Sequence, residues 1–335
     1  MEKLENRKND HIKLAFQSQA IASKRDQRFQ YEPLLSAHPA EGSGPLKILG
    51  KELRAPLWIS SMTGGTRMSG TINRHLARAC AEFGMGMGLG SCRIIMEDPG
   101  FLDDFNMRPI MGPALPLWAN LGIAQVEELI RKKESDKAAA LVETLNADGL
   151  IIHVNPLQEW LQPEGDVLAK APIDTISAFL ELFNYPVIVK ETGQGMGPES
   201  LRRLMQLPLQ AIEFGAFGGT NFARLELLRD EPSAQELLEP LVNVGQDALS
   251  MLEIVNSLAK GQDILCREII ISGGIRSFLD GYYLIQRSVL PAIYGMASAY
   301  LSHAMEGYDA LRNFVEAQIR GLRFAQAYLR PVYEQ

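Results

Sequence analysis

The amino-acid sequence predicts an α/β fold, a (β/α)8 TIM barrel with an N-terminal extension and one long insertion between strands 6 and 7. Two observations predict it. Eight short apolar runs follow one another between residues 57 and 294, and segments with helical periodicity separate most of them. Strands that alternate with helices pair in parallel, and eight strands close a barrel. We expect residues 1–56 to form an extension that closes over the site, and 57–335 to form the barrel.

The expected strands are short apolar runs bounded by glycine, proline or polar residues, as buried parallel strands are. They lie at residues 57–60, 85–88, 115–119, 150–154, 186–190, 210–214, 268–272 and 290–294. The second run has the weakest pattern because two of its four residues are glycine, and the sixth contains polar residues. Residues 1–56 contain no clear strand, although 5–15 has the pattern of a short helix and 38–45 that of a loop.

Helical periodicity predicts helices over residues 68–83, 135–147, 171–183, 198–206 and 277–287. The long segment 215–267 contains a further amphipathic helix at 246–258, so we interpret it as a lid-like insertion followed by the sixth barrel helix. A last helix at 308–329 has apolar residues at helical spacing. This apolar stripe is expected to pack on the core, but it would serve equally well at a subunit interface.

Composition excludes several classes of protein. The chain has 335 residues, is 46% hydrophobic and has a formal net charge of -7, which argues against nonspecific binding to nucleic acid or to a membrane. It contains no apolar run long enough to span a bilayer and no signal-peptide pattern at its start. Cys80, Cys92 and Cys266 are far apart, which predicts neither a zinc site nor disulfides. We therefore expect a reduced, cytoplasmic protein.

Every expected strand is followed by glycine, hydroxyl, amide or single charged residues. These residues lie at the carboxyl ends of the strands, where a barrel of this kind has its functional face. Two of these places resemble phosphate sites. Residues 272–276 (SGGIR) follow the seventh strand, and 295–297 (GMA) open the helix after the eighth. Backbone N–H groups at such turns and helix N-termini favour an anion. A plain tight turn is the alternative for either place alone, but their joint location favours phosphate.

The densest polar segment is residues 149–166, in which an apolar run leads into GLIIHVNPLQEWLQPEGD. A solvated surface loop is the alternative explanation for this segment. Its amides, imidazole and carboxylates suit chemistry better, and Glu159 is the best candidate for a metal ligand. One carboxylate together with ligand phosphates and water suits Mg²⁺. Glu164 and Asp166 could instead be cap or turn residues.

Lys190 ends a buried apolar run, where an ammonium group is costly unless it is paired. It could neutralise the electron-rich edge of a ligand near the barrel axis. The alternative is an ion pair with Glu191 or Glu213.

These motifs together resemble the type 2 isopentenyl-diphosphate Δ-isomerases, which are FMN-dependent (β/α)8 barrels. The resemblance extends over nearly the whole chain, and its most specific parts are HVNPLQE at 153–159 and QPEGD at 162–166. The other matching segments are 7–11 (RKNDH), 62–65 (MTGG), 90–93 (GSCR), 119–122 (ANLG), 189–191 (VKE), 218–220 (GGT) and 272–276 (SGGIR). The glycine motifs alone are shared with other FMN barrels.

The resemblance implies an enzyme that interconverts isopentenyl and dimethylallyl diphosphate with reduced FMN, NADPH and Mg²⁺, as a homo-oligomer (tetramer or octamer). It places FMN on Ser61, Met62, Thr63, Ser91, Asn120, Lys190, Thr220, Gly274, Arg276, Gly295 and Met296. It places the diphosphate substrate on Arg7, Lys8, Ser91, Arg93, His153, Asn155 and Gln158, and the metal on Glu159. Among these, His153, Asn155 and Gln158 are the expected catalytic residues, and positioning is the role that an amide such as Gln158 can fill.

Three places depart from the pattern of the family. Cys92 replaces the usual Gln, which could alter contacts with the flavin or substrate, and segments 243–248 and 294–297 match only loosely. The main alternative function is another FMN-dependent barrel oxidoreductase, such as a 2-hydroxy-acid oxidase. Such enzymes use a His/Arg pair near the flavin, and no such pair follows the seventh strand. A non-catalytic flavin-binding protein is a second alternative, and it would need neither the metal carboxylate nor the Arg7–Lys8 pair.

Overall fold

A computed structural model describes residues 2–39, 44–62, 64–229, 232–261 and 263–333. Eight parallel strands form a closed barrel in which neighbours in sequence are neighbours in space, and β11 pairs with β4 to complete the circle. The strands are β4 (Leu57–Ile59), β5 (Gly86–Gly88), β6 (Leu117–Gly122), β7 (Gly149–Val154), β8 (Val187–Glu191), β9 (Ala211–Glu213), β10 (Ile269–Ser272) and β11 (Ala292–Met296). The predicted barrel and each of its eight strands are confirmed.

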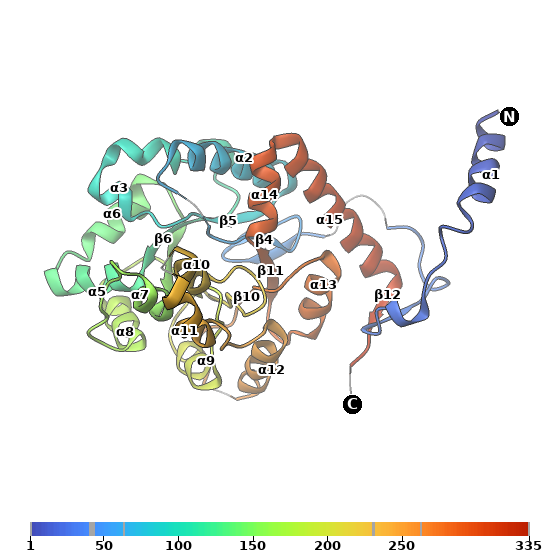
Figure 1. Cartoon of the computed structure of the whole chain (residues 1–335). Helices are drawn as coiled ribbons and strands as arrows, with labels where there is room; N and C mark the ends of the chain where they lie inside the picture. The colour runs from blue at the N-terminus through green and yellow to red at the C-terminus, as the bar shows by residue number, and fades with distance from the viewer. Residues whose placement is uncertain (1, 40–43, 63, 230–231, 262, 334–335) are drawn as a thin grey trace.

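Helices surround the barrel (Figure 1). The main ones are α2 (Arg67–Phe83), α5 (Ile123–Lys132), α6 (Asp136–Thr144), α8 (Pro172–Leu182), α9 (Pro198–Met205), α12 (Ala248–Ala259), α13 (Phe278–Arg287), α14 (Ser298–Glu306) and α15 (Tyr308–Tyr328). The predicted helices are confirmed, including α14 as the helix that opens after the eighth strand, whereas α5 was not predicted. Leu311, Val315 and Leu322 are buried, so the apolar stripe of α15 packs on the core. Within the described ranges, every helix is too short or too polar to span a lipid bilayer.

Short elements build the loops around the barrel. They are α3 (Arg93–Glu97), η2 (Pro99–Asp104), α4 (Arg108–Met111), α7 (Pro156–Leu161), α10 (Phe222–Arg229) and α11 (Pro232–Val242). Helix α10 packs on α7 and α11, and Leu161, Ala223, Leu227 and Val242 form a small apolar cluster separate from the barrel core. The expected division of residues 215–267 is therefore confirmed: α10 and α11 form an added layer, and α12 is the barrel helix.

The N-terminal region differs from the prediction, because it contains three short strands. Strands β2 (Leu46–Ile48) and β3 (Lys51–Leu53) form a hairpin, and β1 (Phe29–Tyr31) pairs with β12 (Leu329–Pro331) at the end of the chain. Three residues are too few to show a period-two pattern in the sequence. The pairing of β1 with β12 anchors the N-terminal region to the barrel. On the N-terminal side of this anchor, η1 (Ala22–Lys24) and α1 (Glu2–Leu14) extend outwards, and α1 stands apart from the barrel (Figure 1).

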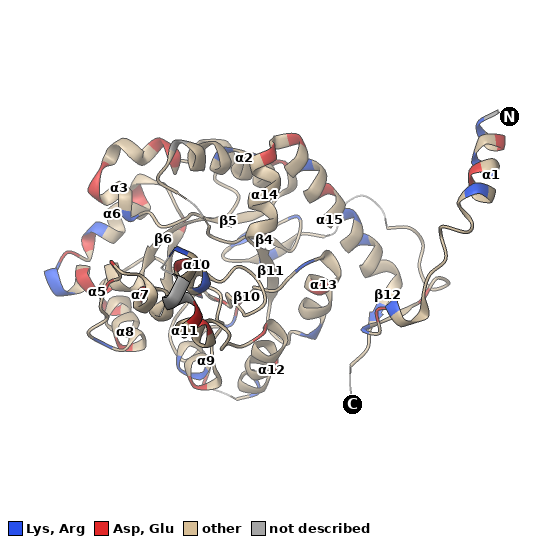
Figure 2. Ribbon diagram, in the orientation of Figure 1, with Lys and Arg blue, Asp and Glu red and all other residues tan. Residues whose placement is uncertain are grey.

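Charged residues of both signs are interspersed along the outer helices (Figure 2), whereas two tryptophans, Trp58 and Trp118, are buried inside the barrel. A Cβ atom on Gly86 would lie 2.7 Å from the Trp58 ring, and one on Gly149 would lie 2.5 Å from the Trp118 ring. The glycines that weaken the strand pattern of β5 are thus what allow Trp58 to fit inside the barrel.

The contact at Gly149 yields a prediction about stability. A Cβ atom there would also lie 2.3 Å from the carbonyl oxygen of Pro186, which belongs to the backbone and cannot move cheaply. We expect Gly149→Ala to lower the free energy of unfolding by about 1–3 kcal/mol. Gly44→Ala is the control, because a Cβ atom there meets nothing within 4 Å. Urea unfolding followed by fluorescence measures both, and equal midpoints for the two variants would contradict the packing described here.

Candidate functional site

Two adjoining cavities open at the carboxyl ends of the barrel strands. The first, of about 70 Å³, is lined mainly by the loops that follow β8, β9, β10 and β11. The second, of about 140 Å³, is lined mainly by residues that follow β5, β6 and β7. Both are lined by Ser61, Met62, Lys190, Thr192 and Phe222. The two cavities therefore form one continuous site across the mouth of the barrel.

The barrel mouth brings together most of the residues predicted from the sequence. Those expected to bind FMN that line the first cavity are Ser61, Met62, Lys190, Thr220, Gly274, Gly295 and Met296. Ser91 and Asn120 line the second cavity together with His153 and Gln158. Arg276 is not among the lining residues: its side chain is exposed, and its backbone N–H donates to Asp280. Thr63 lies outside the described residues.

The first cavity has the features of a phosphate cradle. A Cβ atom on Gly219 would lie 2.9 Å from the backbone nitrogen of Gly274, and Gly273 and Gly274 both have positive φ angles, +89° and +73°. The loops after β9 and β10 can approach this closely only because glycines lie at the contact. Ala297, Ser298 and Ala299, at the start of α14, line the same cavity, and a helix N-terminus favours a bound anion.

Two buried hydroxyl groups near this cradle lack partners. The Oγ atoms of Ser60 and Ser61, which follow β4 and line the first cavity, make no hydrogen bond among the described residues. Buried hydroxyls are normally paired, since leaving one unpaired costs about 1–3 kcal/mol. Unpaired hydroxyls beside a glycine cradle fit a ligand with many acceptor atoms, such as a flavin nucleotide.

Lys190 is buried at the end of β8 and lines both cavities. Its Nζ atom donates to the backbone carbonyl of Glu191 at 2.7 Å, and no carboxylate lies within ion-pairing distance of it among the described residues. The alternative ion pair with Glu191 or Glu213 is therefore not found. The carboxylate of Glu191 instead accepts the N–H groups of Gly193, Gln194 and Gly195, which fixes the loop beside the ammonium group. Burial raises the pKa of Glu191 despite these three bonds.

A hydrogen bond fixes the tautomer of His153, which lies beside Lys190 in the register of β7 and β8. The amide nitrogen of Asn120 donates to the carbonyl of Leu89, so its amide oxygen faces Nδ1 of His153 at 2.8 Å. Because that oxygen can only accept, Nδ1 holds a proton and Nε2 is the free acceptor in the neutral ring. Burial, and secondarily the charge of Lys190, lower the pKa of His153 to about 3.

Asn155 organises the start of α7. Its amide nitrogen donates to Gln158 at 3.0 Å and to Oε1 of Glu159 at 2.9 Å. The amide nitrogen of Gln158 donates in turn to Glu226 on α10 at 3.1 Å. Asn155 itself is buried and does not line either cavity, so in this structure it acts through Gln158 and Glu159.

Sequence reasoning did not identify Glu226, a buried carboxylate that holds Gln158 at the second cavity. A signal for it exists. Ala223, Glu226 and Leu227 have the spacing of one helix face, so a carboxylate interrupts an otherwise apolar stripe. Such an interruption indicates a buried carboxylate with a specific partner.

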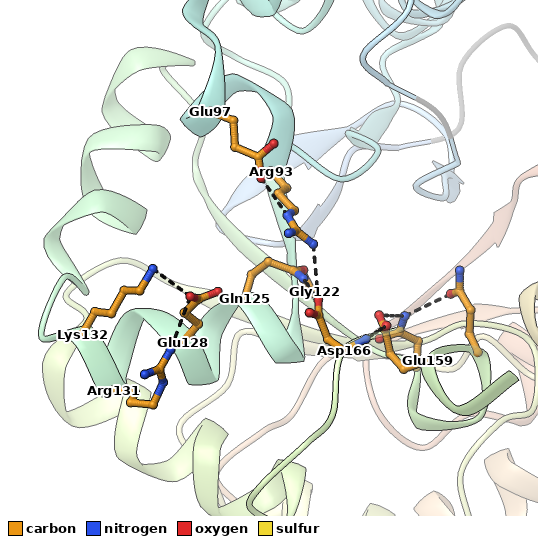
Figure 3. A network of polar contacts seen from close by, with 11 residues as sticks. Arg93, Glu97, Gly122, Gln125, Glu128, Arg131, Lys132, Glu159 and Asp166 are labelled. Carbon is orange, nitrogen blue, oxygen red and sulfur yellow. Dashed lines mark hydrogen bonds and ion pairs between the residues drawn. The ribbon is translucent and has the colours of Figure 1, made fainter. Parts of the chain in front are cut away.

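Glu159 offers a single carboxylate close to the second cavity. Its Oε1 accepts from Asn155, and its Oε2 accepts the backbone N–H of Asp166 (Figure 3). The described residues contain no cluster of three His, Cys, Asp or Glu side chains able to hold a metal ion. This donor set fits a hard cation such as Mg²⁺, which keeps several waters and binds through one carboxylate and ligand phosphates.

The cationic residues of the predicted diphosphate site are only partly assembled. Arg93 is half exposed and forms ion pairs with Glu97 and Asp166 (Figure 3). Arg7 and Lys8 lie on α1, exposed and away from the barrel, so the structure does not bring them to the mouth (Figure 1). The expected closure of the N-terminal extension over the site is not seen in this chain.

Cys92 does not line the site. It is fully buried, its thiol contacts the carbonyl of Gly90, and burial raises its pKa to about 12. It does not line either cavity, although the neighbouring Ser91 lines the second. The expectation that this substitution alters contacts with the flavin or substrate therefore finds no support in the geometry.

Comparison with protein-family models finds none that matches the chain. Curated relatives match it over most of its length. A protein of Nostoc sp. named isopentenyl-diphosphate delta-isomerase is 33% identical over 322 residues, which cover 94% of this chain and 89% of the relative. Proteins with the same name from Stutzerimonas stutzeri and Rickettsia felis are 34% and 35% identical, covering 96% and 82% of this chain and 92% and 77% of their own.

Solved structures with the same fold are more distant in sequence. A mandelate oxidase mutant with an FMN adduct has a TM-score of 0.57 at 16% identity, covering 92% of this chain and 89% of that one. A flavocytochrome b2 variant with bound sulfite has a TM-score of 0.61 at 13% identity, covering 89% and 71%. At these identities the likeness concerns the barrel fold alone.

The environment of His153 yields a prediction about pH. The pKa of His153 in the folded chain lies below the ordinary value of about 6.5. As the pH falls, this imidazole is therefore protonated in the unfolded chain before it is protonated in the folded one. This histidine should therefore lower stability as the pH falls below about 6.5, by up to about 1.4 kcal/mol per pH unit. In the ligand-free protein, NMR of ¹⁵N-labelled histidine should show a neutral ring with Nδ1 protonated from pH 8 to pH 5.5. His153→Gln assigns the signal, and a titration midpoint near 6.5 would contradict the burial described here.

Proposed function

The chain belongs to the isopentenyl-diphosphate delta-isomerase family, and from this membership and the barrel mouth we propose that it interconverts isopentenyl and dimethylallyl diphosphate. The reaction moves a double bond: one carbon gains a proton and another loses one, with no net redox change. Such an enzyme needs an anchor for a diphosphate and an acid–base group held over the alkene. The adjoining cavities offer a place for each.

We assign the first cavity to FMN. Its phosphate would lie against Gly274 and the start of α14, where backbone N–H groups and the helix dipole favour an anion. Lys190 would neutralise the electron-rich edge of the ring, and the unpaired hydroxyls of Ser60 and Ser61 would find acceptors or donors. When bound and reduced, for which NADPH is the proposed electron source, the flavin supplies the acid–base group for the alkene.

We assign the second cavity to the diphosphate. Ser91, His153 and Gln158 line it, and Arg93 follows Ser91 by two residues in the chain. Glu159 would hold a magnesium ion, which would offset the negative charge of the diphosphate, since Mg²⁺ prefers oxygen ligands. An acidic chain of net charge -7 repels a diphosphate at long range, so these local groups must attract it at short range.

The protein side chains then orient and shield the reactants. Gln158 has no acidic proton at neutral pH, so its amide positions the substrate, with Glu226 and Asn155 fixing its rotamer. Neutral His153 presents Nε2 as an acceptor and would donate to a phosphate oxygen only after taking up a proton. Phe222 lines both cavities and provides apolar cover, which limits the access of water to the alkene.

Arg7 and Lys8 remain proposed diphosphate ligands. Residues 28–31 are anchored to the barrel by the pairing of β1 with β12 and by the Arg28–Asp280 ion pair. The link between α1 and this anchor comprises residues 15–27, which span up to about 45 Å when extended. A link of this length would let α1 move toward the mouth of the barrel when a bound diphosphate attracts Arg7 and Lys8.

One observation is the main support for this function: flavin-type and diphosphate-type residues from all parts of the chain converge on one mouth and share five lining residues. The test is deuterium exchange into isopentenyl diphosphate, followed by NMR, with FMN-loaded enzyme that has been reduced with NADPH in D₂O. Exchange and the appearance of dimethylallyl diphosphate are the expected results. No exchange with reduced, magnesium-loaded enzyme would refute the proposal.

A 2-hydroxy-acid oxidase is the second candidate function, since the solved structures of similar fold include a mandelate oxidase. The loop after β10 reads SGGIR at residues 272–276 and contains no histidine to pair with its arginine. That arginine, Arg276, is exposed outside the cavity lining. Oxygen-dependent oxidation of lactate or mandelate without isomerisation would favour the oxidase.

Replacing Lys190 should loosen the flavin. A charge-assisted hydrogen bond contributes about 1.5–3 kcal/mol, so Lys190→Ala should raise the Kd for FMN about tenfold to a hundredfold. Fluorescence titration of the apoprotein with FMN measures this effect. Lys170→Ala, on an exposed loop before α8, is the matched control and should bind FMN normally. Equal affinity in both variants would remove Lys190 from the flavin site.

Replacing Glu159 should weaken the response to magnesium. Glu159→Gln keeps the size of the side chain and its hydrogen bond with Asn155 but removes the negative charge. We expect the Mg²⁺ concentration for half-maximal activity to rise about tenfold or more. Glu128→Gln, at an exposed carboxylate paired with Lys132, is the control (Figure 3). An unchanged magnesium response in Glu159→Gln would exclude Glu159 as the metal ligand.

A further inference from the structure

The turn at residues 162–166 folds back against α7, next to the proposed metal ligand. The N–H of Gly165 donates to the carbonyl of Gln162 at 2.9 Å. A Cβ atom on Gly165 would lie only 1.9 Å from the backbone carbonyl oxygen of Glu159, so a side chain at this position would push the turn away. The glycine of the QPEGD motif is therefore what brings Asp166 to Glu159.

Asp166 uses this placement to connect three groups (Figure 3). Its backbone N–H donates to Oε2 of Glu159 at 2.8 Å. Its carboxylate accepts from Nη1 of Arg93 at 3.3 Å and from the amide of Gln125 at 3.0 Å. Gln125 is itself fixed, because its amide oxygen accepts the N–H of Gly122 at the end of β6.

These contacts hold the long side chain of Arg93 at two of its three guanidinium nitrogens. Glu97 accepts from its Nε at 2.9 Å and Asp166 from its Nη1, whereas Nη2 makes no hydrogen bond with the described part of the chain. An arginine that is half exposed loses up to about 2 kcal/mol of side-chain entropy when a ligand immobilises it. Holding it in advance lowers that cost when the ligand binds.

We propose that Asp166 is a positioning residue that ties the phosphate-binding Arg93 to the metal ligand Glu159, so that magnesium and diphosphate meet a preformed pair of groups. This inference rests on the proposed function, because it assigns Arg93 and Glu159 their roles. It extends that function to the second half of the QPEGD motif. Asp166 does not itself touch the substrate or the metal.

The contacts of Asp166 distinguish the positioning role from two simpler roles: a turn residue, and a carboxylate that competes with the diphosphate for Arg93. A turn residue would need only its backbone, but the Asp166 carboxylate reaches two other elements, α3 and α5. A carboxylate that merely competes with the diphosphate for Arg93 would weaken ligand binding. The two roles predict opposite effects when the carboxylate is removed.

The test uses FMN-loaded protein and the variants Asp166→Ala and Asp166→Asn. In Asp166→Ala, we expect the KM for isopentenyl diphosphate and the Mg²⁺ concentration for half-maximal activity each to rise about fivefold to tenfold. The kcat value and FMN content should be unchanged, because Asp166 contacts neither cavity lining nor flavin residues. Asp166→Asn keeps one amide oxygen as an acceptor and should recover part of the loss.

Glu127→Gln is the matched control. Glu127 also lies on α5 and accepts the backbone N–H of Ala169, three residues beyond Asp166, without contacting Arg93 or Glu159. If the loop needed only a general anchor, Glu127→Gln would raise the KM and the magnesium requirement as Asp166→Ala does. We expect it to change neither.

Calorimetric binding of magnesium pyrophosphate to the oxidised holoprotein tests the inference without turnover. The expected result is weaker binding by about fivefold to tenfold in Asp166→Ala. Unchanged or tighter binding in a variant of normal FMN content and thermal stability would overturn the positioning role, and if Asp166→Ala does not fold, Asp166→Asn decides by the same criterion. A wild-type protein that binds magnesium pyrophosphate but fails to isomerise would refute the proposed function and leave this binding test intact.

Discussion

Closure of eight parallel strands into one barrel is the constraint on which the rest of this structure depends. In a closed parallel barrel, all the strands end on the same rim, so the residues that follow them must meet. Residues as distant in sequence as Ser61, Asn120, Lys190 and Gly295 thereby line one continuous mouth. Closure itself depends on packing inside the barrel, where glycines on β5 and β7 leave room for Trp58 and Trp118.

The charges at the rim of the barrel depend on the burial of Lys190, Glu191 and His153 and on the hydrogen bonds that they make. Lys190 is buried and donates to a backbone carbonyl, with no carboxylate of the described residues in ion-pairing distance, whereas the carboxylate of Glu191 accepts three backbone N–H groups. Burial lowers the pKa of His153, and the charge of Lys190 lowers it further, so the ring stays neutral. The mouth therefore combines a fixed positive charge, uncharged donors and a glycine cradle, an arrangement that favours anions within an acidic chain.

The layer formed by α7, α10 and the 162–166 turn has a different physical character. It has its own small apolar cluster and an internal ion pair between Arg229 and Glu164, and Asp166 connects it to Arg93 on α3 and to Gln125 on α5. Such contacts are individually weak. Their value lies in geometry: they fix the rotamers of Gln158 and Arg93, which would otherwise be free. The barrel supplies rigidity, and this layer fixes the orientation of polar side chains beside the barrel mouth.

The sequence by itself determined the barrel, its strands, most of its helices and the majority of the residues at its mouth. It could do so because apolar periodicity and bounding glycine or polar residues are local signals. In a closed parallel barrel, the residues that follow each strand then lie on one rim. It did not reveal the strands at 29–31 and 46–53, which are too short for a period to show, nor the buried carboxylate Glu226. It also assigned Arg276 and Arg7 to the site, and these assignments stay predictions: the side chain of Arg276 is exposed and does not line the first cavity, and α1 stands apart from the barrel.

Tertiary structure alone decided which side chains share a hydrogen bond. The partner of Asp166 is Arg93, 73 residues away, and the partner of Gln158 is Glu226, 68 residues away. No local pattern encodes such pairs, because each depends on how loops from different strands are placed once the barrel has closed. Sequence periodicity records which face of an element is buried, but the direction of a polar side chain is settled by the partner that burial brings within reach.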